Sequence, residues 1–279
     1  MKNKNVVLTG GGRGIGREIA KKLSSYGANL ALLARTESEL RETYDIINEV
    51  NSRTFYRTLD ISDAVTVRSV FNDILDRMGR IDCLINNAGI QSPIGEFSEV
   101  NSEEWQRNFN VNLFGTTNCT FAVLKKMILQ KKGKIINMSG GGSTSPRTNF
   151  SAYAVSKTAV VRFTETLAEE VRKYNIDVNA IAPGAINTRM LDEVISAGES
   201  AGKEFGDALK RKEEGGDSFS RVADLVSFLV SDLSDGITGK LISAKWDDWE
   251  SKEFQTLTRN EKDFATLRRI DNKTFFKKI

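Results

Sequence analysis

The sequence of 279 residues contains no histidine. Without an imidazole, the chain cannot form a Ser-His-Asp or Cys-His triad or a histidine-ligated zinc or iron site. Its only two cysteines, Cys83 and Cys119, form no C-x-x-C motif, and we expect them to be buried free thiols. We therefore expect no metal site, and in an enzyme the proton chemistry falls to Tyr, Lys, Asp or Glu.

A large charge imbalance and long apolar segments are also missing. Lys+Arg 40 against Asp+Glu 37 gives a net charge of +3, without the basic stripe of a nucleic-acid-binding protein. The chain shows no transmembrane span, and Met1 is followed closely by a strand-like segment at 6–8 rather than a signal-peptide segment. We expect no nucleic-acid partner, no membrane partner and a cytoplasmic location.

Short apolar segments alternate with helix-patterned segments. Strand patterns occur at 6–9, 29–34, 54–59, 81–86, 134–138, 177–182 and 240–243, and helical patterns at 17–26, 36–50, 65–78, 103–130 and 152–174. This alternation is typical of a parallel sheet with helices on both faces. We predict a doubly wound α/β fold with a parallel seven-stranded sheet, the Rossmann fold, in a single domain over residues 1–245.

Two segments depart from the regular alternation. Residues 190–219 are rich in Gly, Ser, Ala and charge, which predicts a mobile substrate lid, with a disordered linker as the alternative. Residues 246–279 form a C-terminal extension in which aromatic and charged side chains alternate. We expect this extension to dock on its own subunit or a neighbour and to line the substrate mouth, with a frayed helix as the alternative. Its aromatic residues are Trp246, Trp249, Phe254, Phe264, Phe275 and Phe276.

A glycine-rich segment, Thr9-Gly10-Gly11-Gly12-Arg13-Gly14-Ile15-Gly16, joins the first strand pattern to the first helical pattern. Glycines permit a tight turn and let backbone amides approach a pyrophosphate, and the helix N-terminus adds partial positive charge. A preceding strand and a following helix are the context that a dinucleotide-binding turn requires. The segment therefore predicts a dinucleotide site.

The end of the second strand pattern indicates which dinucleotide is bound. An acidic residue there binds the 2′-hydroxyl of NAD, whereas a basic residue accommodates the 2′-phosphate of NADP. The sequence has Leu33-Ala34-Arg35-Thr36, without a carboxylate, and Arg13 can approach the same phosphate from the other side. We predict NADP(H); the alternative is that Arg35 only caps the strand.

Tyr153 and Lys157 are four residues apart in a helical pattern, so their side chains share one face. A phenol with a pKa of about 10 transfers protons poorly near neutrality, but an adjacent cation lowers that pKa. Tyr153 can then act as a general acid or base. The alternative is a surface tyrosine beside a solvated lysine.

Taken in order, these motifs resemble the short-chain dehydrogenase/reductase family over Lys4 to Ala244. The resemblance includes Asn86-Asn87-Ala88-Gly89 for the family's N-N-A-G and Pro183-Gly184 with Thr188 for the turn beside the nicotinamide. It implies cofactor-binding roles for Gly10, Arg13, Gly14, Ile15, Gly16, Arg35, Asp60, Ile61, Asn87, Ala88, Gly89, Tyr153, Lys157, Pro183, Gly184, Ile186 and Thr188.

The resemblance also implies catalytic roles. Tyr153 donates a proton to a carbonyl oxygen as hydride passes from the nicotinamide, Lys157 holds the ribose and lowers the phenol pKa, and Asn112 positions a water. The family also uses a serine, whose usual spacing falls on Gly140 here. Ser139 and Ser143 are the candidates, and we favour Ser139; the alternative is that Ser139 only caps the strand.

The implied function is an NADP(H)-dependent oxidoreductase that transfers hydride between the nicotinamide and a carbonyl or secondary alcohol of a small, polar substrate, in a homodimer or homotetramer. A 3-ketoacyl thioester reductase is one alternative, and a catalytically silent NADP-binding or scaffold protein is another. Polar residues expected near the site fit a polar or phosphorylated substrate; they are Arg147, Asn149, Arg189 and the segment 246–249.

Overall fold

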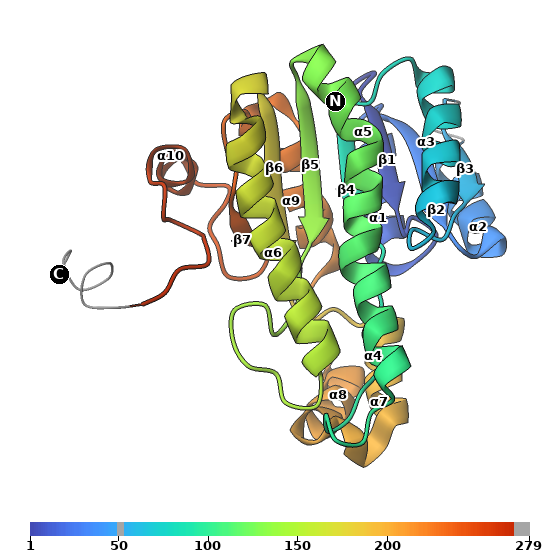
Figure 1. The fold of residues 1–279 in the computed structure, drawn as a ribbon, viewed down its shortest axis with the longest axis vertical. Helices are drawn as coiled ribbons and strands as arrows, with labels where there is room; N and C mark the ends of the chain where they lie inside the picture. Colours follow the sequence, from blue (N-terminus) through green and yellow to red (C-terminus); the bar gives the residue numbers. More distant parts are fainter. Residues whose placement is uncertain (49–52, 271–279) are drawn as a thin grey trace.

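The computed structural model describes residues 1–48 and 53–270, and in this part of the chain seven parallel strands form one sheet (Figure 1). The strand order is β3-β2-β1-β4-β5-β6-β7, which confirms the predicted doubly wound fold. The order reverses between β1 and β4, and ligands of such sheets bind at the carboxyl ends of the strands beside this point. The strands are β1 Asn5–Thr9, β2 Asn29–Ala34, β3 Phe55–Thr58, β4 Cys83–Asn86, β5 Gly133–Met138, β6 Ile176–Ala182 and β7 Leu241–Ser243.

Helices cover both faces of the sheet because alternate strand residues point to opposite sides. On β1, Val6 and Leu8 join the core beneath α1 and α9, whereas Val7 joins the core beneath α3, α5 and α6. The α-helices are α1 Gly14–Ser25, α2 Glu37–Asn48, α3 Ala64–Met78, α4 Ser102–Phe109, α5 Thr116–Gln130, α6 Ser151–Val171, α7 Arg189–Ala197, α8 Lys203–Glu214, α9 Phe219–Val230 and α10 Lys252–Asn260.

The helix predicted over 103–130 has an interruption. A π-helical segment, Asn110–Gly115, joins α4 to α5. Such segments are rare and occur frequently at functional sites. This segment carries Asn112, whose side chain is fully buried.

The segment 190–219 is folded rather than a disordered linker. It contains α7 and α8, which Figure 1 shows beyond the carboxyl end of β5. The side-chain amide of Asn149 donates to the Ser200 carbonyl at 2.9 Å. This bond ties the segment to the loop that precedes α6, so α7 and α8 cover one end of the sheet.

The described part of the C-terminal extension docks on its own subunit. The Leu241 amide donates to the Ala265 carbonyl at 2.8 Å, so the extension covers the outer edge of β7. Trp249 and Phe254 are buried, and the Trp249 ring lies 5.8 Å from that of Phe228 on α9. Trp246 is 79% exposed. Phe275 and Phe276 lie outside the described residues, as does the end of the helical pattern predicted to Val50.

Candidate active site

Two adjoining cavities lie at the carboxyl ends of the strands, with volumes of about 290 and 220 Å³. Together they form what we call the catalytic cleft. The first is lined by the predicted residues Gly10, Arg13, Gly14, Ile15, Gly16, Arg35, Asp60, Ile61, Asn87, Ala88 and Gly89. The second is lined by the predicted residues Ser139, Tyr153, Lys157, Pro183, Gly184, Ile186 and Thr188. Ile15, Asn87, Gly89 and Thr188 line both.

The glycine-rich turn has the shape that a pyrophosphate requires. Gly10 and Gly14 have φ of +66° and +52°, values that favour glycine. A Cβ at Gly16 would overlap the Gly10 carbonyl oxygen, so the turn passes directly against α1. The N-cap residue Arg13 makes no side-chain capping bond, which leaves the first-turn amides of α1 available to an anion. These residues fit a dinucleotide.

Asn87 fixes the glycine-rich turn against the loop that follows β4. Its side-chain amide donates to the carbonyl oxygens of Thr9 and Gly10 at 3.0 and 3.1 Å. The Thr9 hydroxyl accepts from the backbone amides of Asn87 and Ala88 at 3.0 and 3.1 Å. These hydrogen bonds therefore fix the two loops relative to each other at the first cavity.

The two arginines predicted to bind a 2′-phosphate differ in their contacts. Arg13 forms an ion pair with Glu39 at 2.8 Å. Arg35 is exposed at the rim of the cleft and, within residues 1–48 and 53–270, makes no ion pair or hydrogen bond. Burial raises the pKa of the nearby Asp60, but hydrogen bonds from Ser62 and the charge of Arg35 outweigh it and lower that pKa overall. Arg35 thus offers an unpaired guanidinium at the rim of the first cavity.

Tyr153 and Lys157 lie in the first turns of α6, with the Lys157 amine 5.7 Å from the centre of the Tyr153 ring. Both side chains are buried, so the alternative of a solvated surface pair is wrong. The Lys157 amine donates to the Met138 carbonyl at 2.8 Å, and burial lowers the Lys157 pKa to about 8.

The predicted lowering of the Tyr153 pKa by Lys157 is wrong for this structure. Burial raises the Tyr153 pKa, Arg147 opposes that shift and Glu204 adds to it. The sequence pattern identified the right neighbour but not the dominant influence, because the low polarity around a buried phenol disfavours its charged form.

Asn112 lies behind the catalytic pair in the π-helical segment. Its amide nitrogen donates to the Ile90 carbonyl, the Asn108 side chain and the Ser156 hydroxyl at 2.8–3.0 Å. A Cβ on Gly89 would lie 3.0 Å from the Asn112 side-chain oxygen and 3.3 Å from the Lys157 amine. The side chains of Asn112 and Lys157 therefore both lie against Gly89.

The two candidate serines occupy different positions. The Ser139 hydroxyl is buried, lines the cleft and has no hydrogen-bond partner among the described residues. Ser143 is buried as well but does not line the cleft as described. A Cβ at Gly140, the position given by the family spacing, would overlap the Tyr153 hydroxyl, so a side chain there requires Tyr153 to shift.

Sequence patterns missed several cleft residues and misplaced one segment. Gln91 and Arg211 line the second cavity, Glu39 and Glu193 the first, and none of the four belongs to a motif. Arg147 and Arg189 do line the cleft, as expected. No residue of 246–270 lines either cavity, so the expectation that the segment 246–249 lines the substrate mouth is wrong for these two cavities.

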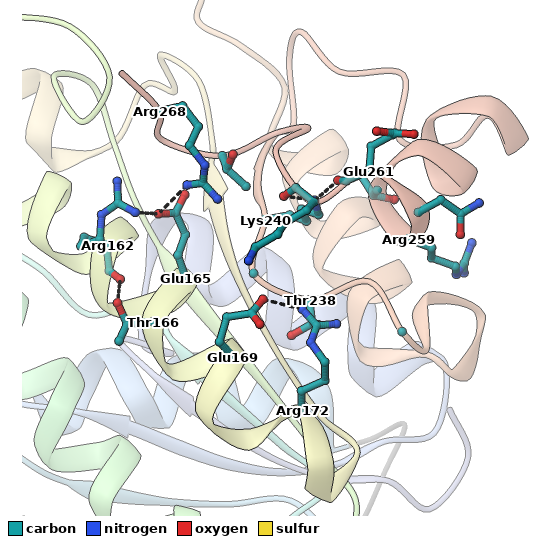
Figure 2. A pocket seen from close by; sticks show the side chains of 16 residues that line it. Arg162, Glu165, Thr166, Glu169, Arg172, Thr238, Lys240, Arg259, Glu261 and Arg268 are labelled. Atoms are coloured by element: carbon teal, nitrogen blue, oxygen red, sulfur yellow. Dashed lines mark hydrogen bonds and ion pairs between the residues drawn. The ribbon is translucent and has the colours of Figure 1, made fainter. Parts of the chain in front are cut away.

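A separate cavity of about 480 Å³, which we call the tail cavity, lies between α6 and the C-terminal extension (Figure 2). Figure 2 shows Glu165 between Arg162 and Arg268, with oxygen to nitrogen distances of 2.6 and 3.7 Å. The Lys240 amine donates to the carbonyls of Glu261, Lys262 and Phe264 at 2.7–3.1 Å. These charges fasten the extension to the sheet.

Comparison with known proteins assigns the family. A family profile described as short chain dehydrogenase matches residues 4–198. The chain belongs to the short-chain dehydrogenase/reductase family. The chain is therefore an oxidoreductase that acts on CH–OH and C=O groups, and its family binds a nicotinamide cofactor. Within the described residues, no helix is both long and apolar enough to cross a membrane.

Three similar proteins of the short-chain dehydrogenase/reductase family differ in the substrates and cofactors that their names give. A 2,3-dihydro-2,3-dihydroxybenzoate dehydrogenase of Bacillus subtilis (strain 168) is 31% identical over 85% of this chain and 93% of its own. A variant of actinorhodin polyketide ketoreductase with NADPH has a TM-score of 0.80 at 28% identity, over 87% of this chain and 97% of its own. NAD⁺-bound xylitol dehydrogenase has a TM-score of 0.80 at 26% identity over the same shares.

Proposed function

We propose that this protein is an NADP(H)-dependent oxidoreductase that interconverts a carbonyl and a secondary alcohol on a small, polar substrate. The observation that carries the proposal is the position of Tyr153. Its side chain lines the second cavity, which adjoins the cavity of the glycine-rich turn. A general acid therefore lies where a nicotinamide and a carbonyl would meet. When bound, the cofactor supplies or accepts the hydride at the substrate carbon.

Tyr153 supplies the proton in the direction of reduction. Burial raises its pKa, so the phenol is protonated at neutral pH and can donate to a carbonyl oxygen. The phenolate that remains recovers a proton from Lys157, whose pKa of about 8 makes it the stronger acid. This order of acidities favours carbonyl reduction near neutral pH and alcohol oxidation at higher pH.

Ser139 and Asn112 support the same step. The unpartnered Ser139 hydroxyl can donate a hydrogen bond to the substrate oxygen, where negative charge develops. Asn112 holds the loop at Ile90 through two hydrogen bonds, at 2.9 Å each, and thereby positions Gly89 beside Lys157. We assign Tyr153, Lys157, Ser139 and Asn112 to catalysis.

The preference for NADP(H) rests on Arg35. An unpaired guanidinium at the end of β2 suits the 2′-phosphate, and the strand tip carries no carboxylate that would bind the hydroxyl of NAD. The related structures include one with NADPH and one with NAD⁺, so the family alone leaves both cofactors open. Arg13 contributes less, since Glu39 already neutralises it.

The segment 190–219 is proposed as the substrate lid, because α7 and α8 contribute Leu191, Val194 and Arg211 to the second cavity. A homodimer or homotetramer is also proposed. Phe121 and Leu129 on α5 are 75% and 78% exposed, and Val155 on α6 is 49% exposed, which suits helix packing between subunits.

The test is a panel of ketones, aldehydes and acetoacetyl thioesters with NADPH, comparing the wild type with Tyr153→Phe and the control Tyr174→Phe. We expect Tyr153→Phe to reduce turnover by roughly 10²- to 10⁴-fold while NADPH binding, followed by fluorescence, persists. Tyr174→Phe should behave as the wild type does. NADPH binding without turnover of any panel member would support the silent scaffold, and an active Tyr153→Phe enzyme would refute the catalytic assignment.

A further inference from the structure

The second cavity of the cleft has an uneven charge distribution. Its described lining includes the cationic side chains Arg147, Lys157 and Arg211 but no aspartate or glutamate. Lys157 belongs to the catalytic pair. The two arginines have no role in the proposed proton transfer, and a cavity of about 220 Å³ places them near any substrate held at Tyr153.

Arg147 is held in a geometry suited to a carboxylate. Its Nε and one terminal nitrogen donate to the two carboxylate oxygens of Glu204 on α8, at 2.6 and 2.5 Å. The guanidinium lies 3.8 Å from the centre of the Phe150 ring and 5.4 Å from that of Tyr153. This two-bond arrangement is the one that arginine forms with planar carboxylates. An internal carboxylate thus already occupies Arg147 within reach of the catalytic phenol.

Arg211 contributes a second guanidinium from the same lid helix. It follows Glu204 by seven residues on α8, so both side chains lie on one face of the helix. Its Nε is buried and has no hydrogen-bond partner among the described residues. A buried N–H without a partner is costly, and an anion in the cavity would satisfy it.

We propose that the substrate carries a carboxylate, which Arg147 and Arg211 bind beside the Tyr153 hydroxyl in place of Glu204. This inference rests on the proposed oxidoreductase function and names its substrate class. Glu204 holds Arg147 in position before substrate binds. Exchange of one carboxylate for another keeps Arg147 paired throughout, and Arg211 then connects α8 to the bound substrate.

Turnover of matched acids and esters tests the inference. The probes are 4-acetylbenzoate and its neutral methyl ester, each reduced with NADPH to a secondary alcohol. For the wild type we expect a higher kcat/KM for the acid. Arg147→Gln and Arg211→Gln should each lower the acid-to-ester ratio by roughly 10- to 100-fold, the value of a charge-assisted hydrogen bond.

Glu204→Gln gives the opposite and more discriminating result, because misfolding cannot produce a gain. Loss of the internal competitor should raise the acid-to-ester ratio by about threefold or more. The matched control is Glu214→Gln at the end of α8, an exposed glutamate whose substitution should leave the ratio unchanged. An unchanged ratio in Glu204→Gln together with an unchanged ratio in Arg147→Gln overturns the inference.

Binding without turnover separates this inference from the proposed function. Calorimetry with benzoate and benzamide, in the presence of NADP⁺, should show selective binding of benzoate that Arg147→Gln abolishes. Equal binding of the two compounds overturns the carboxylate site, even if neutral carbonyls are reduced. Selective benzoate binding supports the site even if no carbonyl is reduced, in which case the proposed reductase activity alone is refuted.

Discussion

The catalytic cleft and the tail cavity are both rich in arginine and lysine, but they differ in the ion pairs and hydrogen bonds that these cations make. In the tail cavity, Glu165 lies between Arg162 and Arg268, and Lys240 donates to three backbone carbonyls. In the catalytic cleft, Arg35 makes no ion pair or hydrogen bond with the described residues, and the buried Nε of Arg211 has no hydrogen-bond partner among them.

This difference distinguishes cations that stabilise the fold from cations that are available to bind a ligand. A buried charge is tolerated when protein groups satisfy it. In the tail cavity, the buried Glu165 Oε2 accepts no hydrogen bond but is ion-paired with two arginines, and the Lys240 amine is hydrogen-bonded. The cleft has an exposed guanidinium without a protein partner, Arg35, at the end where a dinucleotide phosphate is expected. It has a buried Nε without a partner, that of Arg211, where a substrate carboxylate is expected. Charge count alone does not separate the two cavities. Arg13 and Arg147 of the cleft are paired with Glu39 and Glu204, so the contrast rests on Arg35 and Arg211.

The largest expected effect concerns Lys157, the buried cation of the cleft. Its pKa is lowered to about 8 in the folded chain, from 10.5. Between these values the unfolded state binds a proton that the folded state has lost, so this group makes the unfolding free energy rise with pH. The rise amounts to about 3 kcal/mol at most.

Urea unfolding between pH 7.5 and 10.5 measures that rise, and Lys157→Met should lack it. Lys125→Met, which alters an exposed lysine on α5, should keep the wild-type slope. Identical pH dependence in the wild type and Lys157→Met would contradict the assignment of a buried, proton-releasing amine to the cleft.

Ser139→Ala removes the unpartnered hydroxyl of the cleft. We expect kcat to fall about a hundredfold, the usual loss for one donor to a developing oxyanion. Steady-state kinetics with NADPH provide the measurement, and Ser143→Ala serves as the matched control, because Ser143 does not line the cleft as described. A larger loss in Ser143→Ala would reverse the choice of serine.

Lys240→Met removes hydrogen bonds of the tail cavity and leaves the catalytic cleft unaltered. Three carbonyls lose their shared donor, and we expect the unfolding free energy to fall by about 2 kcal/mol with kcat/KM unchanged. Chemical unfolding measures the first quantity and steady-state kinetics the second on the same variant, with Lys252→Met, which alters an exposed lysine on α10, as the control. A loss of activity without a loss of stability would show that the tail cavity contributes to activity and would contradict its structural role.

Arg35→Ala has the smallest expected effect. The Kd of NADPH should rise about tenfold through loss of one charge-assisted contact, whereas the Kd of NADH should stay the same. Fluorescence titration compares the two cofactors, with the exposed Arg68→Ala on α3 as the control. A wild type that prefers NADH would refute the assignment of Arg35 to the 2′-phosphate.

Much of the fold was predictable from the sequence because the strands are short apolar segments bounded by turn residues. Each of the seven strand patterns corresponds to an observed strand. The π-helical interruption at Asn110–Gly115 was not predictable, because it arises from a local change in backbone hydrogen bonding within an otherwise regular helical pattern.

The site was predictable where a motif encodes local geometry, as at the glycine-rich turn or the i, i+4 pair of Tyr153 and Lys157. It was not predictable where long-range folding decides the environment. The direction of the Tyr153 pKa shift depends on burial, and Arg147 meets Glu204 only because α8 folds over the cleft. The expectation for Trp249 failed for the same reason, because this aromatic residue, expected at the substrate mouth, lies in the core against α9.

Hydrogen–deuterium exchange of the full chain with and without NADPH compares the two cavities in one measurement. We expect NADPH to slow exchange at the glycine-rich turn, at the loop that follows β4 and at the start of α6. Exchange at 160–172 and 240–268, which surround the tail cavity, should not change. Protection confined to the tail cavity, or no protection in the catalytic cleft, would contradict the claim that unpaired cations mark the ligand site.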